Sequence, residues 1–178
     1  MERLGQDFFA RDCLEAAPAM VGKLLYCVSS GGARCLRITE TEAYRGTEDT
    51  ACHASRGKTQ RNKLLWYAPG TVYIYLCYGI HWLLNAITGE EGQPQGVLIR
   101  ACENYPGPGR LTKALGINGA LNGESFVTSE KIWLSDDGCR PKLTRARRVG
   151  IGYASPEDQE KLWRFVMESG GRTQTVQK

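Results

Sequence analysis

The chain has 178 residues, which is long enough for one domain with a sizeable hydrophobic core. Its 23 Lys and Arg residues against 19 Asp and Glu give a net charge of +4, which permits an anionic partner without requiring one. The 7 cysteines are odd in number and never occur as C-x-x-C, which argues against a disulfide framework and a zinc site. No apolar run is long enough for a signal peptide or a membrane span, so we expect a cytoplasmic protein without membrane contacts.

The first predicted element is a helix over about residues 13–21. Asp12 followed by Glu15 is a capping-box pattern at its start, and Gly22 is suited to end it. Pro18 lies inside this range and should keep the helix short or bend it.

Strands dominate the rest of the chain. Residues 23–44 predict two strands joined by a turn at Gly31-Gly32, a loop follows to about residue 62, and further strands are expected over residues 71–78, 80–87, 96–103, 131–136 and 145–154. Two more helices are expected over residues 109–117, opened by Pro108 and stopped near Gly116, and 155–167, with Ser155 as N-cap and Pro156 in the first turn. Since strands outnumber helices and are mostly joined by turns, the fold class is α+β with an antiparallel sheet.

One predicted strand carries two acids, in the segment "RITETEAYRGTEDTACH". Alternation places Ile38, Glu40, Glu42 and Tyr44 on one face, with the two carboxylates roughly 6–7 Å apart along the strand. If that face is buried, the charges compete and one pKa rises, which suits a general base that activates a water. On an exposed face both acids would instead pair with basic side chains. The spacing does not say which glutamate would be the base; His53, one of two histidines, follows nearby.

The segment "GTVYIYLCYGIHWLLN" places Tyr73, Tyr75 and Tyr78 just before Gly79, the residue that allows the chain to turn. A buried tyrosine must find a partner for its hydroxyl, so core strands usually carry Val, Ile or Phe. Either these hydroxyls are satisfied in a polar layer, or the rings face a flat molecule that is not protein. A large ring at an exposed turn, as Tyr78 would be, predicts a contact.

Two stretches are strongly basic and contain no acid. "RGKTQRNK" carries Arg56, Lys58, Arg61 and Lys63, and "RPKLTRARR" covers residues 140–148. Each could be no more than a solvated basic loop. Together with the aromatic rings and the paired carboxylates, however, they indicate an enzyme that acts on nucleic acid.

Several longer segments go further and carry a resemblance to a known family. They are "ITETEAYRGTEDTACHASRG", "TQRNKLLWYAPGTVYIYLCYGIHWLLN", "GVLIRA", "GPGRLTKALGIN" and "RRVGIGYA…LWRF". In this order they resemble the alkyladenine (3-methyladenine) DNA glycosylases, from about Arg3 to Phe165. The resemblance implies a single domain over residues 1–178, with a curved antiparallel sheet, a protruding β-hairpin, flanking short helices and a divergent tail after about residue 167.

The resemblance also implies roles for residues of a base-binding pocket. Glu42 matches the general base that activates the attacking water, and Arg100 matches the arginine that helps to hold the water and the sugar-phosphate. Tyr44, His53 and Tyr75 match the side chains that sandwich the flipped base.

Other matched positions lie around that pocket. Asn85 matches the side chain that crowds the pocket floor and disfavours the exocyclic amine of guanine, and Tyr78 matches the ring that enters the duplex. Arg110 falls on a phosphate contact, and the basic residues of 56–63 are expected to contact phosphates too. Tyr73 is equally compatible with a scaffold role. Departures from the family pattern are Gln60 and Leu162 where Pro is usual, Gly119 in place of a basic contact, and a short segment between Arg100 and Gly107.

The implied activity is excision of alkylated or deaminated purines, of the 3-methyladenine, 7-methylguanine, hypoxanthine and ethenoadenine class, from double-stranded DNA. Hydrolysis by an activated water would leave an abasic site and require no metal and no other cofactor. We expect a monomer, associated with the nucleoid if the protein is bacterial. Two alternatives stay open: a catalytically silent nucleic-acid-binding module on the same scaffold, and a hydrolase of free nucleosides.

Overall fold

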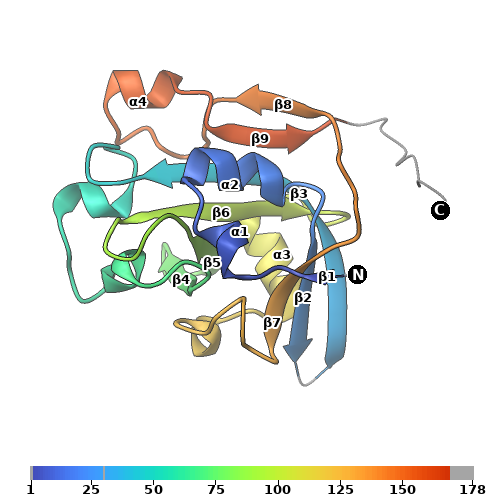
Figure 1. Cartoon of the computed structure of the whole chain (residues 1–178). Coiled ribbons are helices and arrows are strands. Elements are labelled where there is room, and N and C mark those ends of the chain that lie inside the picture. Colours follow the sequence, from blue (N-terminus) through green and yellow to red (C-terminus); the bar gives the residue numbers. More distant parts are fainter. Residues whose placement is uncertain (1, 30, 169–178) are drawn as a thin grey trace.

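The computed structural model describes residues 2–29 and 31–168, so the expected divergent tail lies almost entirely outside the described residues. Within them the protein forms one antiparallel sheet flanked by short helices, which confirms the predicted α+β class (Figure 1). The strands are β1 (Glu2–Arg3), β2 (Leu24–Ser29), β3 (Gly32–Arg45), β4 (Val72–Cys77), β5 (His81–Ile87), β6 (Gln95–Cys102), β7 (Ile132–Asp136), β8 (Leu143–Ala146) and β9 (Arg164–Met167).

The order of the strands is β1-β7-β2-β3-β6-β5-β4, with β9 paired to the far half of β3 and β8 paired to β9. The helices are α1 (Gln6–Phe9), α2 (Cys13–Met20), α3 (Pro108–Leu115) and α4 (Pro156–Glu160), with 3-10 turns η1 (His53–Arg56), η2 (Lys63–Trp66) and η3 (Gly119–Leu121). Figure 1 shows β3 bending from its hairpin with β2 into its pairing with β6, which confirms the predicted curvature. None of the helices described is long and apolar enough to cross a bilayer.

Local signals explain where two of the helices begin and end. Asp12 caps α2 by accepting a hydrogen bond from the Leu14 N–H at 2.9 Å, and Gly22, with φ +92°, follows its end. Pro108 opens α3, and Gly116 closes it in the left-handed conformation with φ +69°. The predictions for both helices are confirmed.

The buried hydrophobic side chains of the described residues form three clusters, and alternation along β4 separates the two largest; the third is small and consists of Ala51, Ile151 and Ala154. Val72 and Ile74 of β4 pack into the larger core together with Ala43 of β3. Tyr73 is buried in a smaller cluster on the opposite face, beneath η1 and η2, and Tyr75 packs against it. The tyrosines therefore belong to a separate layer, away from the main core.

Two predicted elements are wrong in extent. The helix expected over residues 155–167 ends at Glu160, because the chain from Arg164 onward becomes β9 and pairs with both β3 and β8. The strand expected over residues 145–154 ends at Ala146, and the chain then turns so that the Arg148 side chain is buried and the Val149 backbone N–H reaches Glu42, while the Val149 side chain stays exposed. Pairing with partners distant in sequence decided both cases.

Candidate active site

The alternation of side chains along β3 is interrupted between Ile38 and Thr41. Register shifts flank Glu40, and Ile38 packs in the main core together with Ala43, five positions later. The prediction that Ile38 shares a face with the two glutamates is therefore wrong. The irregularity is a β-bulge, which bends the strand and re-aims the side chains near it.

Glu42 is completely buried and has four polar neighbours. Its Oε1 accepts a hydrogen bond from the Val149 N–H at 2.8 Å, and its Oε2 accepts one from the Tyr44 hydroxyl at 2.8 Å. The Nε of Arg100 lies 3.6 Å from Oε1. Burial raises the pKa of Glu42 above its ordinary value, Arg100 and the two hydrogen bonds oppose the rise, and Glu40 adds to it. The result is a carboxylate in a water-poor site that accepts a proton more readily than an ordinary glutamate.

Glu40 has a different environment from Glu42. One of its oxygens lies 3.0 Å from the Nε of Arg100 and 2.9 Å from the Nη1 of Arg164. Pairing with basic side chains, the alternative reading of both acids, thus applies to Glu40. The arrangement favours Glu42 as the base.

The tyrosine-rich layer forms a small cavity. Tyr44, His53, Tyr73, Tyr75 and Asn85 line it, and its volume of about 20 Å³ is the space of one water molecule. The rings of His53 and Tyr75 lie 4.6 Å apart at 62°, and the His53 Nδ1 lies 3.0 Å from the Tyr73 hydroxyl. Tyr73 is thereby satisfied within the protein, as a scaffold residue would be.

Burial keeps these aromatic side chains uncharged. It lowers the pKa of His53, with Arg61 adding to the effect, so the imidazole is neutral near pH 7. It raises the pKa of Tyr73 to about 12 and that of Tyr75 further still. Two charged groups lie against the Tyr44 end of this layer: the Glu42 carboxylate, which accepts a hydrogen bond from the Tyr44 hydroxyl, and the buried Arg148 guanidinium, 4.9 Å from the centroid of the Tyr44 ring. Such a slot suits a flat ring that is neutral or cationic.

An open groove of about 560 Å³ adjoins the cavity, since Cys52 and His53 line both. Arg56, Arg61 and Tyr78 also line the groove. The predicted phosphate contacts are therefore not equivalent. The remaining three lie elsewhere: Lys58 lies over the ring of Trp66, Lys63 is half-buried in η2, and Arg110 lines a separate surface hollow with Arg34 and Lys113.

Tyr78 stands at the tip of the hairpin formed by β4 and β5 and is 90% exposed. Its φ is +51° and that of Gly79 is +70°, and the Ile80 N–H donates to the Cys77 carbonyl at 3.1 Å. Positive φ at both central positions is typical of a type I′ turn, which favours Asn and Gly over a bulky residue. With so little of its surface covered by the described residues, the Tyr78 ring points away from the sheet.

Two important residues escaped the sequence analysis. Arg148, counted there in a basic stretch, is buried and forms a two-pronged ion pair with Asp49, at 2.6 and 2.8 Å. Its guanidinium lies 4.9 Å from the ring centroids of both Tyr44 and Trp163. The pair holds the chain so that the next N–H, that of Val149, points at Glu42. An arginine among five basic residues gives no signal of burial, and only the three-dimensional pairing reveals it.

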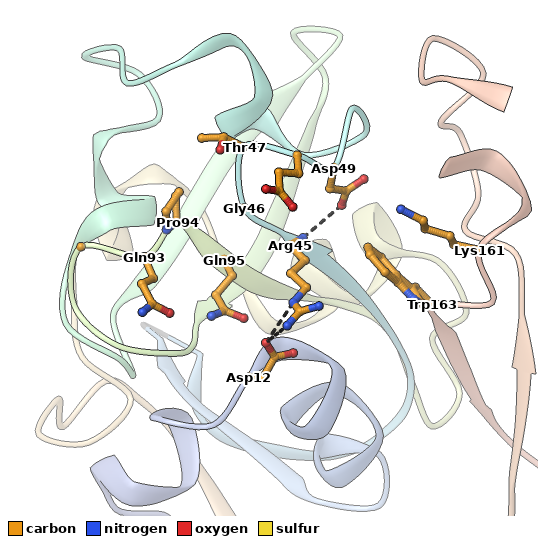
Figure 2. Close-up of a pocket in the computed structure, with 12 residues that line it drawn as sticks. Asp12, Arg45, Gly46, Thr47, Asp49, Gln93, Pro94, Gln95, Lys161 and Trp163 are labelled. Atoms are coloured by element: carbon orange, nitrogen blue, oxygen red, sulfur yellow. Dashed lines mark hydrogen bonds and ion pairs between the residues drawn. The ribbon is translucent and has the colours of Figure 1, made fainter. Parts of the chain in front are cut away.

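The outer side of the Asp49 loop faces a hollow of about 500 Å³, which Figure 2 shows. There the Arg45 side chain pairs with Asp12 at 2.9 Å, and its backbone N–H donates to Asp49 at 3.0 Å. Lys161 lies over the Trp163 ring at 4.7 Å. None of the predicted site residues lines this hollow. The contacts of Arg45 with Asp12 and Asp49 at its wall support the Asp49 loop.

A third residue absent from the sequence-based set is Tyr153, which lines the same groove as Tyr78. It is 61% exposed, yet its hydroxyl donates to the Ala51 carbonyl at 2.8 Å. An exposed ring fixed at its far end is a ready platform for a flat ligand.

Comparison with known proteins identifies the family of this chain. The family model described as methylpurine-DNA glycosylase (MPG) matches residues 7–106 and 103–170. The "Putative 3-methyladenine DNA glycosylase" of Nitrosococcus oceani is 42% identical, covering 90% of this chain and 87% of that protein. Proteins of the same name from Methanocella arvoryzae and Clostridium perfringens are each 38% identical, with 93% of this chain covered and 92% and 96% of theirs. The chain therefore belongs to the methylpurine-DNA glycosylase family.

Proposed function

We propose that this protein excises alkylated or deaminated purines from double-stranded DNA, with Glu42 as the general base. The observation that carries the proposal is a buried carboxylate with a raised pKa beside an aromatic, uncharged slot. The family supports DNA as the substrate. Burying a carboxylate costs free energy, and Glu42 has no ion pair as close as that of the structural Asp49 with Arg148 to offset it, which favours a catalytic role over a silent binding module.

Access to the glycosidic bond requires that the damaged nucleotide leave the base stack, at a cost of a few kcal/mol. We assign Tyr78 to the space that the base vacates, because its ring is exposed at a hairpin tip. Arg56 and Arg61 would hold phosphates along the adjoining groove. The small cavity must widen to admit a purine among the rings of Tyr44, His53 and Tyr75.

The reaction replaces one bond at C1′ of the deoxyribose by another. A water attacks C1′ and transfers its proton to Glu42, while the bond from C1′ to the purine nitrogen breaks and its electron pair leaves with the base. The negative charge of Glu42 would stabilise the cation-like sugar. Arg100 would help to orient the water. A purine alkylated at N3 or N7 is already cationic and leaves without an acid, whereas hypoxanthine must gain a proton.

The substrate assignment is tested with duplexes that carry hypoxanthine, ethenoadenine or 7-methylguanine. We expect the protein, acting as a monomer, to release free base and leave abasic sites in at least one of them. The matching free nucleosides should be poor substrates, because they lack the phosphates that Arg56 and Arg61 would hold. Equal rates on nucleosides and duplexes would favour a nucleoside hydrolase, and no release from any duplex would refute the proposal.

A further inference from the structure

We propose that Glu40 is a positioning residue that draws Arg100 away from Glu42 and so leaves Glu42 free to accept the proton of the water. The inference rests on the proposed function. It assigns a purpose to the first acid of the strand, Glu40, whose side chain does not line the aromatic slot.

Distances show which acid holds Arg100. Its Nε lies 3.0 Å from the Glu40 Oε1 but 3.6 Å from the Glu42 Oε1, so both contacts are ion pairs and the closer one is with Glu40. Arg164 approaches the same Glu40 oxygen at 2.9 Å, while its own Nε donates to the Arg147 carbonyl at 2.7 Å. Glu40 is thus fixed from β9 and in turn fixes Arg100 from β3.

The strand register favours this division. Glu40 pairs with Ala101 and Thr41 with Ile99, so Arg100 is the extra residue in β6 at this point. A bulged residue is not bound to strict alternation, and its side chain can be re-aimed along the strand. Here the re-aimed side chain meets Glu40 in preference to Glu42.

The choice of partner sets how strong a base Glu42 is. An arginine paired closely with a carboxylate stabilises its charged form and weakens it as a base. The groups that act on Glu42 are Glu40 and Tyr44 of β3, Tyr75 of β4, Arg100 of β6, Arg148 and the Val149 N–H of the turn after β8, and, through Glu40, Arg164 of β9. Among them Arg100 opposes the raised pKa of Glu42 most strongly, so its position matters most.

Two substitutions should then act in opposite directions. Glu40→Gln removes a negative neighbour and frees Arg100 to approach Glu42, and both changes lower the pKa of Glu42. Arg164→Met leaves Arg100 as the sole partner of Glu40, so Arg100 moves no closer to Glu42 while one positive charge is lost, and the pKa of Glu42 rises. General damage to the fold would not give shifts of opposite sign.

The experiment measures single-turnover base release from a 7-methylguanine duplex as a function of pH. That base is cationic, so the acidic limb reports the general base without a leaving-group proton. We expect Glu40→Gln to move the limb to lower pH and to lower the plateau roughly tenfold, against the roughly 10²–10⁴-fold contribution of a general base. Arg164→Met should move the limb to higher pH, and the control Glu91→Gln, exposed between β5 and β6, should change neither.

A second readout does not depend on activity. In protein with ¹³C-labelled glutamate carboxyl groups, the Glu42 signal should titrate at lower pH in Glu40→Gln than in wild type. Unshifted titration would overturn the inference even if the enzyme is active, whereas a wild type that releases no base would refute the proposed function and leave this titration as the test. Loss of activity in Glu40→Gln equal to that in Glu42→Gln would also overturn it, since Glu40 would then share the role of base. If Glu40→Gln fails to fold, an unshifted Arg164→Met decides against it.

Discussion

Replacement of Asp49 by Asn tests the buried ion pair that supports the site. The Asp49 carboxylate accepts four hydrogen bonds: two from Arg148 and one each from the backbone N–H groups of Arg45 and Ala51. The side chains of Asp49 and Arg148 are 1% and 0% exposed. An Asn keeps the shape but removes the negative charge and replaces one acceptor oxygen by a donor NH₂, so the guanidinium of Arg148 remains buried without its counter-charge.

Breaking a buried pair in this way costs about 3–5 kcal/mol, because the remaining charge is not compensated. Since the free energy of unfolding of a typical domain is only about 5–15 kcal/mol, a loss of this size should be detectable in an unfolding experiment. For a chain of this length it corresponds to a decrease in Tm of roughly 10 °C.

The assay is urea unfolding followed by tryptophan fluorescence. The exposed neighbour Glu48 supplies the control, since Glu48→Gln should change the free energy of unfolding by less than about 0.5 kcal/mol. The double variant Asp49→Asn with Arg148→Met should be more stable than Asp49→Asn alone, because no unpaired charge is left inside. A loss below about 1 kcal/mol in the single variant would refute the reasoning.

Other predictions concern DNA. Tyr78→Ser should weaken binding of a lesion duplex by roughly 1–3 kcal/mol and should reduce the ethenoadenine fluorescence that reports unstacking of the base. Tyr78→Trp should retain much of both. Unchanged affinity and fluorescence in Tyr78→Ser would show that Tyr78 does not fill the space that the flipped base leaves. Replacing Arg56 and Arg61 together by Gln should lower the slope of log K for DNA binding against log salt concentration by roughly two units. Replacing Lys58 and Lys63, which lie outside the groove, should lower it less. Equal effects of the two double variants would show that the DNA phosphates do not lie along this groove. Borohydride should trap no protein–DNA adduct, since water is the nucleophile, and EDTA should not inhibit; a trapped adduct would point to an amine nucleophile.

Local chemistry determined much of the fold and could be read from the sequence. The caps at Asp12 and Gly116 and the alternation of Val72 and Ile74 with the tyrosines depend on residues only a few positions apart. These signals are local, so they can be read without knowing which strands pair.

What escaped prediction depends on distant partners. The end of α4 at Glu160 follows from the pairing of β9 with β3, more than a hundred residues away. Likewise, the distinction between Glu40 and Glu42 comes from a bulge and from Arg164, neither of which the E-T-E spacing reveals. The spacing predicted that two acids compete, and the pairing determines which one is left free.

The rate of base release by Glu42→Gln tests the central claim most directly. Gln keeps the volume and can still accept the Val149 N–H hydrogen bond, but it has no charge and cannot take a proton from water. We predict that single-turnover release falls by roughly 10²–10⁴-fold while affinity for the lesion duplex changes little. Glu40→Gln, measured beside it, should lose far less. Release by Glu42→Gln within about tenfold of wild type would contradict the assignment of Glu42 as the base.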